Sequence, residues 1–229
     1  GLNVYDIKQS SFYSNLIFNS IINNTKHKFA TGINFAYDNY NEFVGLTDYG
    51  RVDNSVGAFF EYTYDNDDNF SLVLGGRVDN HNRLGTFVTP RLHLRYNPWE
   101  KSVLRFSAGR GKRSANIFAE NQSLFASART FDILDTNGKI YGLDPEIAWN
   151  YGLSFNQKFK IFGRSADAGF DFYKTDFTKQ VVVDLYTPTA IAGTHQVLFY
   201  NLNGKSYANS LQVDFNVELV KHLDLRTAY

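Results

Sequence analysis

The stretch YANSLQVDFNVEL, at residues 207–219, decides the fold class of this chain. Apolar residues occupy alternate positions from Leu211 to Leu219, and polar residues from Gln212 to Glu218 fill the positions between them. Successive side chains of a β-strand point to opposite faces. The stretch therefore predicts a strand with one apolar face and one polar face.

The same alternation recurs along most of the chain, in segments of about ten residues or more. In several segments the polar positions carry charges in mid-strand, as at Arg91 and Arg95 or at Asp167 and Asp171. In a membrane barrel such a face lines a polar lumen, while the apolar face meets lipid. The predicted strands are residues 10–22, 28–41, 55–65, 69–80, 87–97, 102–113, 146–161, 165–186, 197–219 and 222–229.

The connections between these segments alternate in length. Short ones, rich in Asn, Asp, Gly and Pro as hairpin turns are, lie at residues 23–28, 65–68, 97–101, 162–165 and 220–222. Longer ones lie at residues 42–54, 81–86, 114–145 and 187–196. Tight turns at one end and long loops at the other are typical of an antiparallel transmembrane β-barrel.

Composition narrows the class further. Aromatic residues make up 17% of the chain and cluster near segment ends, as at Tyr96 and Trp99 or at Trp149 and Tyr151, where they suit the two membrane interfaces. No apolar run approaches the roughly 18 residues of a membrane helix. The 23 basic and 23 acidic residues cancel, which argues against a nucleic-acid partner. Without Cys, disulfides and Cys metal sites are excluded.

A run of motifs between Gly76 and Tyr151 carries a family resemblance. The first three motifs are G-x-R-x-D, then T-P-R-x-x-L-x-Y-x-P, then L-R-x-S-x-G-x-G-x-R-x-A-N, and L-D-P-E-I-A-W-N-Y follows them. In this order they resemble the barrel region of TonB-dependent outer-membrane receptors. Their matching positions are Gly76, Arg77, Asp79, Thr89, Pro90, Arg91, Leu94, Tyr96, Pro98, Leu104, Arg105, Ser107, Gly109, Gly111, Arg113, Ala115, Asn116, Pro145, Glu146, Asn150 and Tyr151.

The resemblance implies an all-β, antiparallel transmembrane barrel in the outer membrane of a Gram-negative bacterium. About ten strands of a barrel of roughly 22 would be present, with residues 1–229 forming part of one barrel domain. The chain lacks Met even at position 1, so we expect an internal fragment without the plug domain and the TonB-contacting segment. The implied partners are outer-membrane lipid, the plug, the TonB complex and a scarce solute taken up actively: a siderophore, haem, cobalamin, a metal chelate or a glycan.

Recognition of that solute is expected at the long loops, 42–54, 114–143 and 187–196, because loops carry binding on a rigid scaffold. A basic group at the end of segment 102–113 could form an electropositive rim for an anionic solute, although a solvated strand end explains it more simply. Aromatic residues of the longest loop could stack on a ligand or fold over the barrel mouth. The candidate solute-binding residues are Arg110, Lys112, Arg113, Arg129, Tyr141 and His195.

A second basic set follows the polar face of two adjacent segments: Arg91, His93, Arg95 and Arg105. A turn at 97–101 places Arg95 opposite Arg105, and like charges across strands repel, so acidic partners are expected nearby. In the resembling family such residues face the plug. We favour that structural role over a role in permeation, since charges that become buried need partners.

Catalysis has little support in the sequence. Asp79 and His81 offer a carboxylate and an imidazole, but no nucleophile is placed beside them, and G-x-S-x-G is absent. No His spacing suits a metal, so we expect no enzyme activity, cofactor or metal site. The alternative to a transport receptor is a plug-free outer-membrane channel, or a structural or adhesive barrel.

Overall fold

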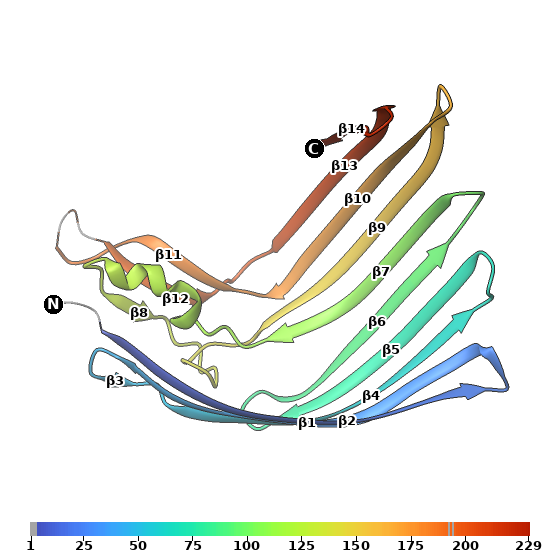
Figure 1. The fold of residues 1–229 in the computed structure, drawn as a ribbon. Helices are drawn as coiled ribbons and strands as arrows, with labels where there is room; N and C mark the ends of the chain where they lie inside the picture. Colours follow the sequence, from blue (N-terminus) through green and yellow to red (C-terminus); the bar gives the residue numbers. More distant parts are fainter. Residues whose placement is uncertain (1–3, 192, 194) are drawn as a thin grey trace.

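The computed structural model describes residues 4–191, 193 and 195–229. Ten long strands form one antiparallel sheet, here called the wall sheet, which curves like a trough (Figure 1). The all-β, antiparallel prediction of about ten strands is confirmed. The strands, in spatial order, are β1 (Tyr5–Ile22), β2 (Asn24–Val44), β4 (Arg51–Asp65), β5 (Phe70–His81), β6 (Gly85–Tyr96), β7 (Ser102–Arg113), β9 (Glu146–Ile161), β10 (Arg164–Lys179), β13 (Ser206–Val220) and β14 (Leu223–Ala228), with the short β3 (Thr47–Asp48) attached to β2.

Register separates the two faces of the wall sheet. One row of directly paired residues crosses six strands and is apolar throughout: Leu72, Leu94, Phe106, Leu153, Phe172 and Leu211. A neighbouring row on the other face is polar: Arg95, Arg105, Ser154, Asp171 and Gln212. The predicted alternation is therefore carried across the sheet as two chemically distinct surfaces, as a lipid-facing and lumen-facing wall requires.

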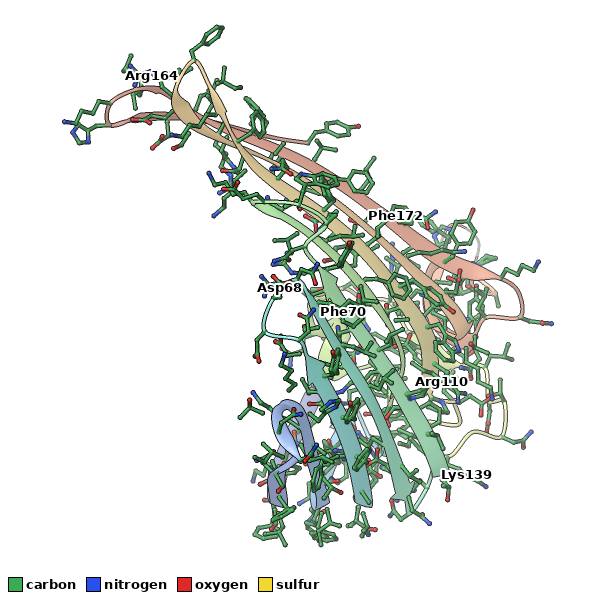
Figure 2. The ribbon with its side chains drawn as sticks, turned by 90° about the vertical axis from the view of Figure 1, so that its right-hand side faces the viewer. Asp68, Phe70, Arg110, Lys139, Arg164 and Phe172 are labelled. Atoms are coloured by element: carbon green, nitrogen blue, oxygen red, sulfur yellow. The ribbon has the colours of Figure 1, made fainter. Side chains whose placement is uncertain are left out.

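Short turns join strands at one end of the trough, where Figure 2 shows Asp68 and Arg164. These turns place a residue in the left-handed region, as with Asn23 (φ 64°), Asp67 (φ 63°) and Lys101 (φ 62°). Asn and Asp tolerate this conformation better than most residues. Trp99, beside one of these turns, contacts Phe155 with ring centroids 5.8 Å apart. Trp149 and Tyr151 stack on each other further toward the opposite end of the trough. Aromatic pairs therefore lie toward both ends of the wall sheet.

The opposite end differs from the prediction in two connections and two strands. Residues 81–86 form a tight hairpin rather than a long loop, because β5 continues to His81 and β6 begins at Gly85. The connection predicted at residues 42–54 is shorter in the structure, because β2 extends to Val44 and β4 begins at Arg51, with β3 between them. The predicted strands 165–186 and 197–219 are each wrong as single elements. β10 ends at Lys179, and β13 begins only at Ser206.

Residues 181–186 and 197–201, the remaining parts of those two predicted strands, belong to a separate unit, here called the loop module. It contains the 3-10 segment η1 (Ala119–Ala126) and a second sheet in the order β11-β12-β8. The strands are β8 (Phe131–Ile133), β11 (Val181–Pro188) and β12 (His195–Asn201), and β12 pairs in parallel with β8. Residues 181–186 and 197–202, on either side of the predicted loop, remain apolar and strand-like, so local sequence does not show that the chain changes sheets there.

The loop module has its own hydrophobic core. Ile117, Phe118, Val197 and Phe199 are nearly inaccessible to solvent, and Phe118 lies edge-on to Phe131 at 6.0 Å. Tyr5, Val44 and Tyr49 of the wall sheet and its connections pack against this core. Figure 1 shows the loop module at the end of the trough where β1 begins. The aromatic residues of the longest loop join this core: Phe118 lies in it, and Phe125, Phe131 and Tyr141 pack against it.

No helix among the described residues is long and apolar enough to cross a membrane.

Candidate functional site: a cationic hollow on the concave wall

A hollow of about 600 Å³ lies on the polar face of the wall sheet. Its lining residues come from β1, β2, β4, β5, β6 and β7, and a hollow shared by six neighbouring strands lies on the concave side of the sheet. We call it the upper hollow because it lies toward the long-loop end. Its polar and charged lining residues are Tyr13, Asn15, Asn34, Arg77, Asp79, Thr89, Arg91, Arg110 and Lys112.

On one side of the upper hollow, Arg77 forms an ion pair with Asp79. Arg77 donates through Nε to Asp79 Oδ2 at 2.7 Å and through Nη2 to Asn34 Oδ1 at 2.7 Å. Gly57, between these strands, leaves the space that the three polar groups fill: a Cβ there would lie 2.1 Å from Asp79 Oδ1. The positive charge of Arg77 is therefore already neutralised within the wall.

Arg91 is also neutralised. Its Nη2 forms an ion pair with Glu61 Oε2 on β4, two strands away. The guanidinium can reach across β5 because Gly75 has no side chain, and a Cβ at that position would lie 2.8 Å from Arg91 Nε. Of the predicted plug-facing residues, Arg91 alone lines the upper hollow.

Arg110 and Lys112 are different, because no described carboxylate pairs with either. Both lie over the ring of Phe87, with Arg110 Cζ 4.5 Å and Lys112 Nζ 4.7 Å from its centroid. Lys112 also donates from Nζ to the carbonyl oxygen of Leu84 at 3.0 Å. The structure thus brings these two candidate residues together beside the hollow, with uncompensated positive charge.

An opening in the sheet puts them there. β6 and β7 pair from Tyr96↔Leu104 to Arg91↔Gly109, and the ladder stops at that pair. The next residue of β6 is Pro90, which has no N–H to donate and is tolerated in sheets mainly where pairing ends. Beyond this point β7 pairs only with β9, so Arg110 and Lys112 can turn into the gap toward Phe87.

A lower hollow of about 480 Å³, nearer the short turns, collects the other predicted lumen residues. His93, Arg95 and Arg105 line it together with Asp171 and Tyr173. Arg95 and Arg105 are directly paired across the strands, as predicted. An acidic residue, Asp171, lies in the same hollow as expected, but neither arginine forms an ion pair with a carboxylate of the described residues. Both side chains are exposed, and solvent screening lets the two like charges coexist.

Tyr141 does not face either hollow. It belongs to a buried group at the outer ends of β2 and β4, here called the Arg51 cluster: Tyr5, Tyr40, Glu42, Arg51, Asp53, Asn116 and Tyr141. Arg51 Nη1 donates to Glu42 Oε2 at 2.6 Å and to the Tyr141 hydroxyl at 2.8 Å. The Tyr141 hydroxyl in turn donates to Glu42 Oε2 at 2.5 Å.

The protonation state of Tyr141 follows from this burial. Desolvation raises the pKa of the Tyr141 hydroxyl well above its ordinary value, and the hydrogen bond to Glu42 raises it further. The nearby Arg51 guanidinium lowers it by less. The hydroxyl is therefore held in its neutral form, which can both accept from Arg51 and donate to Glu42.

The remaining candidates lie in or beside the loop module. Arg113 pairs with Glu146 at 2.6 Å and with Glu120 at 3.0 Å, so it fastens the start of the long loop. Arg129 lies just before β8, and His195 is the first residue of β12. Neither lines the upper or the lower hollow.

Asp79 and His81 have structural partners. Asp79 accepts from Arg77, and His81 Nδ1 accepts from the backbone N–H groups of Arg83 and Leu84 within the β5–β6 turn. Within residues 4–191, 193 and 195–229, no group of three or more His, Cys, Asp or Glu side chains is arranged to hold a metal.

Sequence reasoning missed Glu42, Arg51 and Asp53. One signal was available, because Arg51 and Asp53 stand two apart on a strand, the spacing that Arg77 and Asp79 show in G-x-R-x-D. Such residues share a face, so an ion pair could be expected. Glu42 and Asn116 had no comparable signal, since their contacts join distant parts of the chain.

The sequence model described as "TonB dependent receptor-like, beta-barrel" matches residues 3–228. The chain therefore belongs to this family, as the motif resemblance indicated. The described residues form a fragment of such a barrel, without a plug among them. No curated protein matches the chain by sequence.

Solved structures share the fold at low identity. The siderophore receptor PirA from Pseudomonas aeruginosa aligns at a TM-score of 0.67 and 16% identity, over 97% of this chain and 42% of that one. A mutant ferric enterobactin receptor PfeA from the same bacterium aligns at 0.69 and 15%, over 97% and 35%. A Serratia marcescens hemophore receptor HasR, in complex with its hemophore HasA and haem, aligns at 0.61 and 15%, over 93% and 40%. The chain thus spans well under half of each.

Proposed function

We propose that this chain is part of the barrel domain of an outer-membrane receptor that takes up an anionic solute in a TonB-dependent manner. The observation that carries the proposal is the pair Arg110 and Lys112, two cations without carboxylate partners beside the upper hollow. Unneutralised charge in a concave, partly desolvated site attracts ions of opposite sign and raises their local concentration.

The class of solute follows from charge and from the family. Ferric siderophores and haem carry negative groups and are the ligands named for structurally similar receptors. Arg110 offers a planar fork for a carboxylate or catecholate, and Lys112 a compact second charge. Arg129 and His195 would meet the solute at the loop module, while Arg113 and Tyr141 would act indirectly by holding the long loop.

The lower hollow supports a different partner. Arg95 and Arg105 face the lumen side by side, and His93 adds a third basic group. We propose that they meet the plug domain of the full-length receptor, whose carboxylates would neutralise them, and that Arg91, already paired with Glu61, contacts the plug beside them. The TonB complex would act on that plug from the inner side of a Gram-negative outer membrane. The barrel itself would change no bond and need no cofactor.

The proposal is tested by uptake in a strain that lacks the receptor and is complemented with the full-length gene. Growth is measured on single ferric siderophores, haem, cobalamin and glycans. Arg110→Gln and Lys112→Gln should each weaken binding of the recognised solute about tenfold, the effect of losing one charge-assisted hydrogen bond.

Lys174→Gln is the matched control. Lys174 is a strand lysine already paired with Asp176 at 3.2 Å and lies outside the hollow, so uptake should be unchanged. Uptake that continues without TonB would favour the passive-channel alternative. Growth that depends on no solute would favour a structural or adhesive barrel.

A further inference from the structure

The longest loop, residues 114–145, is bound near both of its ends by one arginine from another part of the chain. Arg51 Nη2 donates to Asn116 Oδ1 at 2.6 Å, near the start of the loop. Arg51 Nη1 donates to the Tyr141 hydroxyl at 2.8 Å, near its end. One guanidinium therefore fastens both ends of the loop to β4.

The surroundings make Arg51 a strong attachment. Its side chain is only 5% exposed, and the Glu42 side chain that it pairs with is 0% exposed. Its Cζ lies 4.1 Å from the ring centroid of Tyr40 and 4.7 Å from that of Tyr141. A buried arginine fork that satisfies several acceptors is far more costly to break than an exposed ion pair.

Glu42 brings in the first strand as well. Its Oε1 accepts from the Tyr5 hydroxyl at 2.9 Å, and its Oε2 accepts from Arg51 and Tyr141. Removing Arg51 would leave this carboxylate buried without a cation. A buried, uncompensated charge is strongly unfavourable, so the site would relax by admitting water and releasing the loop.

The cluster also extends toward the upper hollow. Asp53 Oδ2 accepts from Arg51 Nε at 3.2 Å, and Asp53 Oδ1 lies 3.1 Å from Arg83 Nε in the β5–β6 turn. The next residue of that turn, Leu84, accepts from Lys112, one of the two unpaired cations. Loop, turn and hollow are thus joined through consecutive polar contacts.

We propose that the Arg51 cluster is a latch that keeps the loop of residues 114–145 folded into the barrel mouth. The loop is then a preformed cover, and its release requires the cluster to open. The importance of this cover for uptake rests on the proposed function. The existence of the latch does not, because the contacts that form it all lie within this chain.

The test measures loop opening directly, by limited trypsin digestion of the full-length receptor in detergent without solute. Lys139 is exposed within the loop and provides the cleavage site (Figure 2). When closing is fast, the cleavage rate follows the population of the open form. Arg51→Gln should accelerate cleavage after Lys139 by about tenfold or more, because it removes charged hydrogen bonds that hold the loop.

Arg77→Gln is the matched control. Arg77 also pairs with an aspartate two residues away, but it contacts no residue of the loop, so cleavage should stay at the wild-type rate. Tyr141→Phe keeps the test valid if Arg51→Gln fails to fold, because it removes only one hydroxyl. It should accelerate cleavage by a smaller factor.

Strand content measured by circular dichroism shows whether each barrel is intact. An intact Arg51→Gln barrel cleaved at the wild-type rate would overturn the latch. An unchanged rate in Tyr141→Phe would do the same where Arg51→Gln is unfolded. Equal acceleration in Arg77→Gln would show general loosening of the barrel and would also overturn it. These cleavage rates are measured without solute, so a failure of the proposed uptake function would not change how they are interpreted.

Discussion

Tyr141 lies in the longest loop, and its partly buried side chain is hydrogen-bonded to Arg51 and Glu42. Its hydroxyl accepts from Arg51 and donates to Glu42, which only a neutral phenol can do. Burial, followed by the bond to Glu42, raises its pKa above the ordinary 10.0. A group whose folded-state pKa is raised contributes stability that is complete below the unfolded pKa and is lost as pH rises above it.

The loop is therefore expected to loosen in alkaline solution. Between about pH 9 and about pH 11, unfolded or released tyrosine ionises while the latched hydroxyl cannot, so the latched form loses its advantage. Spin labels at Lys139→Cys and Asp68→Cys report the change as a broader distance distribution in the full-length receptor. The 229 residues contain no other Cys.

Two variants check that this response comes from Tyr141. Tyr141→Phe should show a broad distance distribution at both ends of this pH range, and its distribution should change less with pH than that of the wild type. Tyr186→Phe removes a loop tyrosine that is 80% exposed and should respond like wild type. An equal pH response in wild type and Tyr141→Phe would assign the effect to other groups.

At the scale of the element, the strands combine long polar side chains with glycines that make room for them. Gly57 on β4 is the clearest case, because Asn34, Arg77 and Asp79 converge over it. Gly76, on the adjacent strand and the opposite face, has no atom within 4 Å of a Cβ position. The two glycines thus have different structural roles, although both lie within neighbouring strands of the wall sheet.

Substitution by alanine separates these roles. Gly57→Ala forces the Arg77–Asp79 pair apart and should destabilise the barrel by about 1–3 kcal/mol, the usual cost of overpacking. Gly76→Ala meets no neighbour and should be neutral or slightly stabilising, since Ala restricts the unfolded chain more than Gly does. The temperature at which the folded barrel unfolds in detergent measures both effects. Equal effects of the two substitutions would refute the proposed close packing at Gly57.

At the scale of the whole molecule, the wall sheet is open. β1 and β14 each have one neighbour in the sheet, so one edge of each strand has unpaired backbone groups. Phe12, Leu16 and Phe18 are 58–68% exposed along β1. Unpaired edges are not tolerated in lipid and promote association in water. The wall sheet of these residues is therefore open and does not close into a barrel.

Residues 1–229 expressed alone are therefore expected to aggregate or associate edge to edge. Size-exclusion chromatography in detergent should show broad, high-mass species, whereas the full-length receptor should elute as a defined particle. A sharp monomer peak from the segment, with native strand content, would contradict this expectation.

The sequence alone determined the strands, their two faces and the short turns, because side-chain alternation and turn chemistry are local properties of the chain. The same alternation misled where residues 165–186 and 197–219 leave one sheet for another, since strand periodicity does not identify the pairing partner. Only the tertiary structure decided the Arg51 cluster, in which Tyr141 meets Glu42 across 99 residues. It also decided that Arg110 and Lys112 turn toward Phe87, because that depends on where the β6–β7 ladder ends.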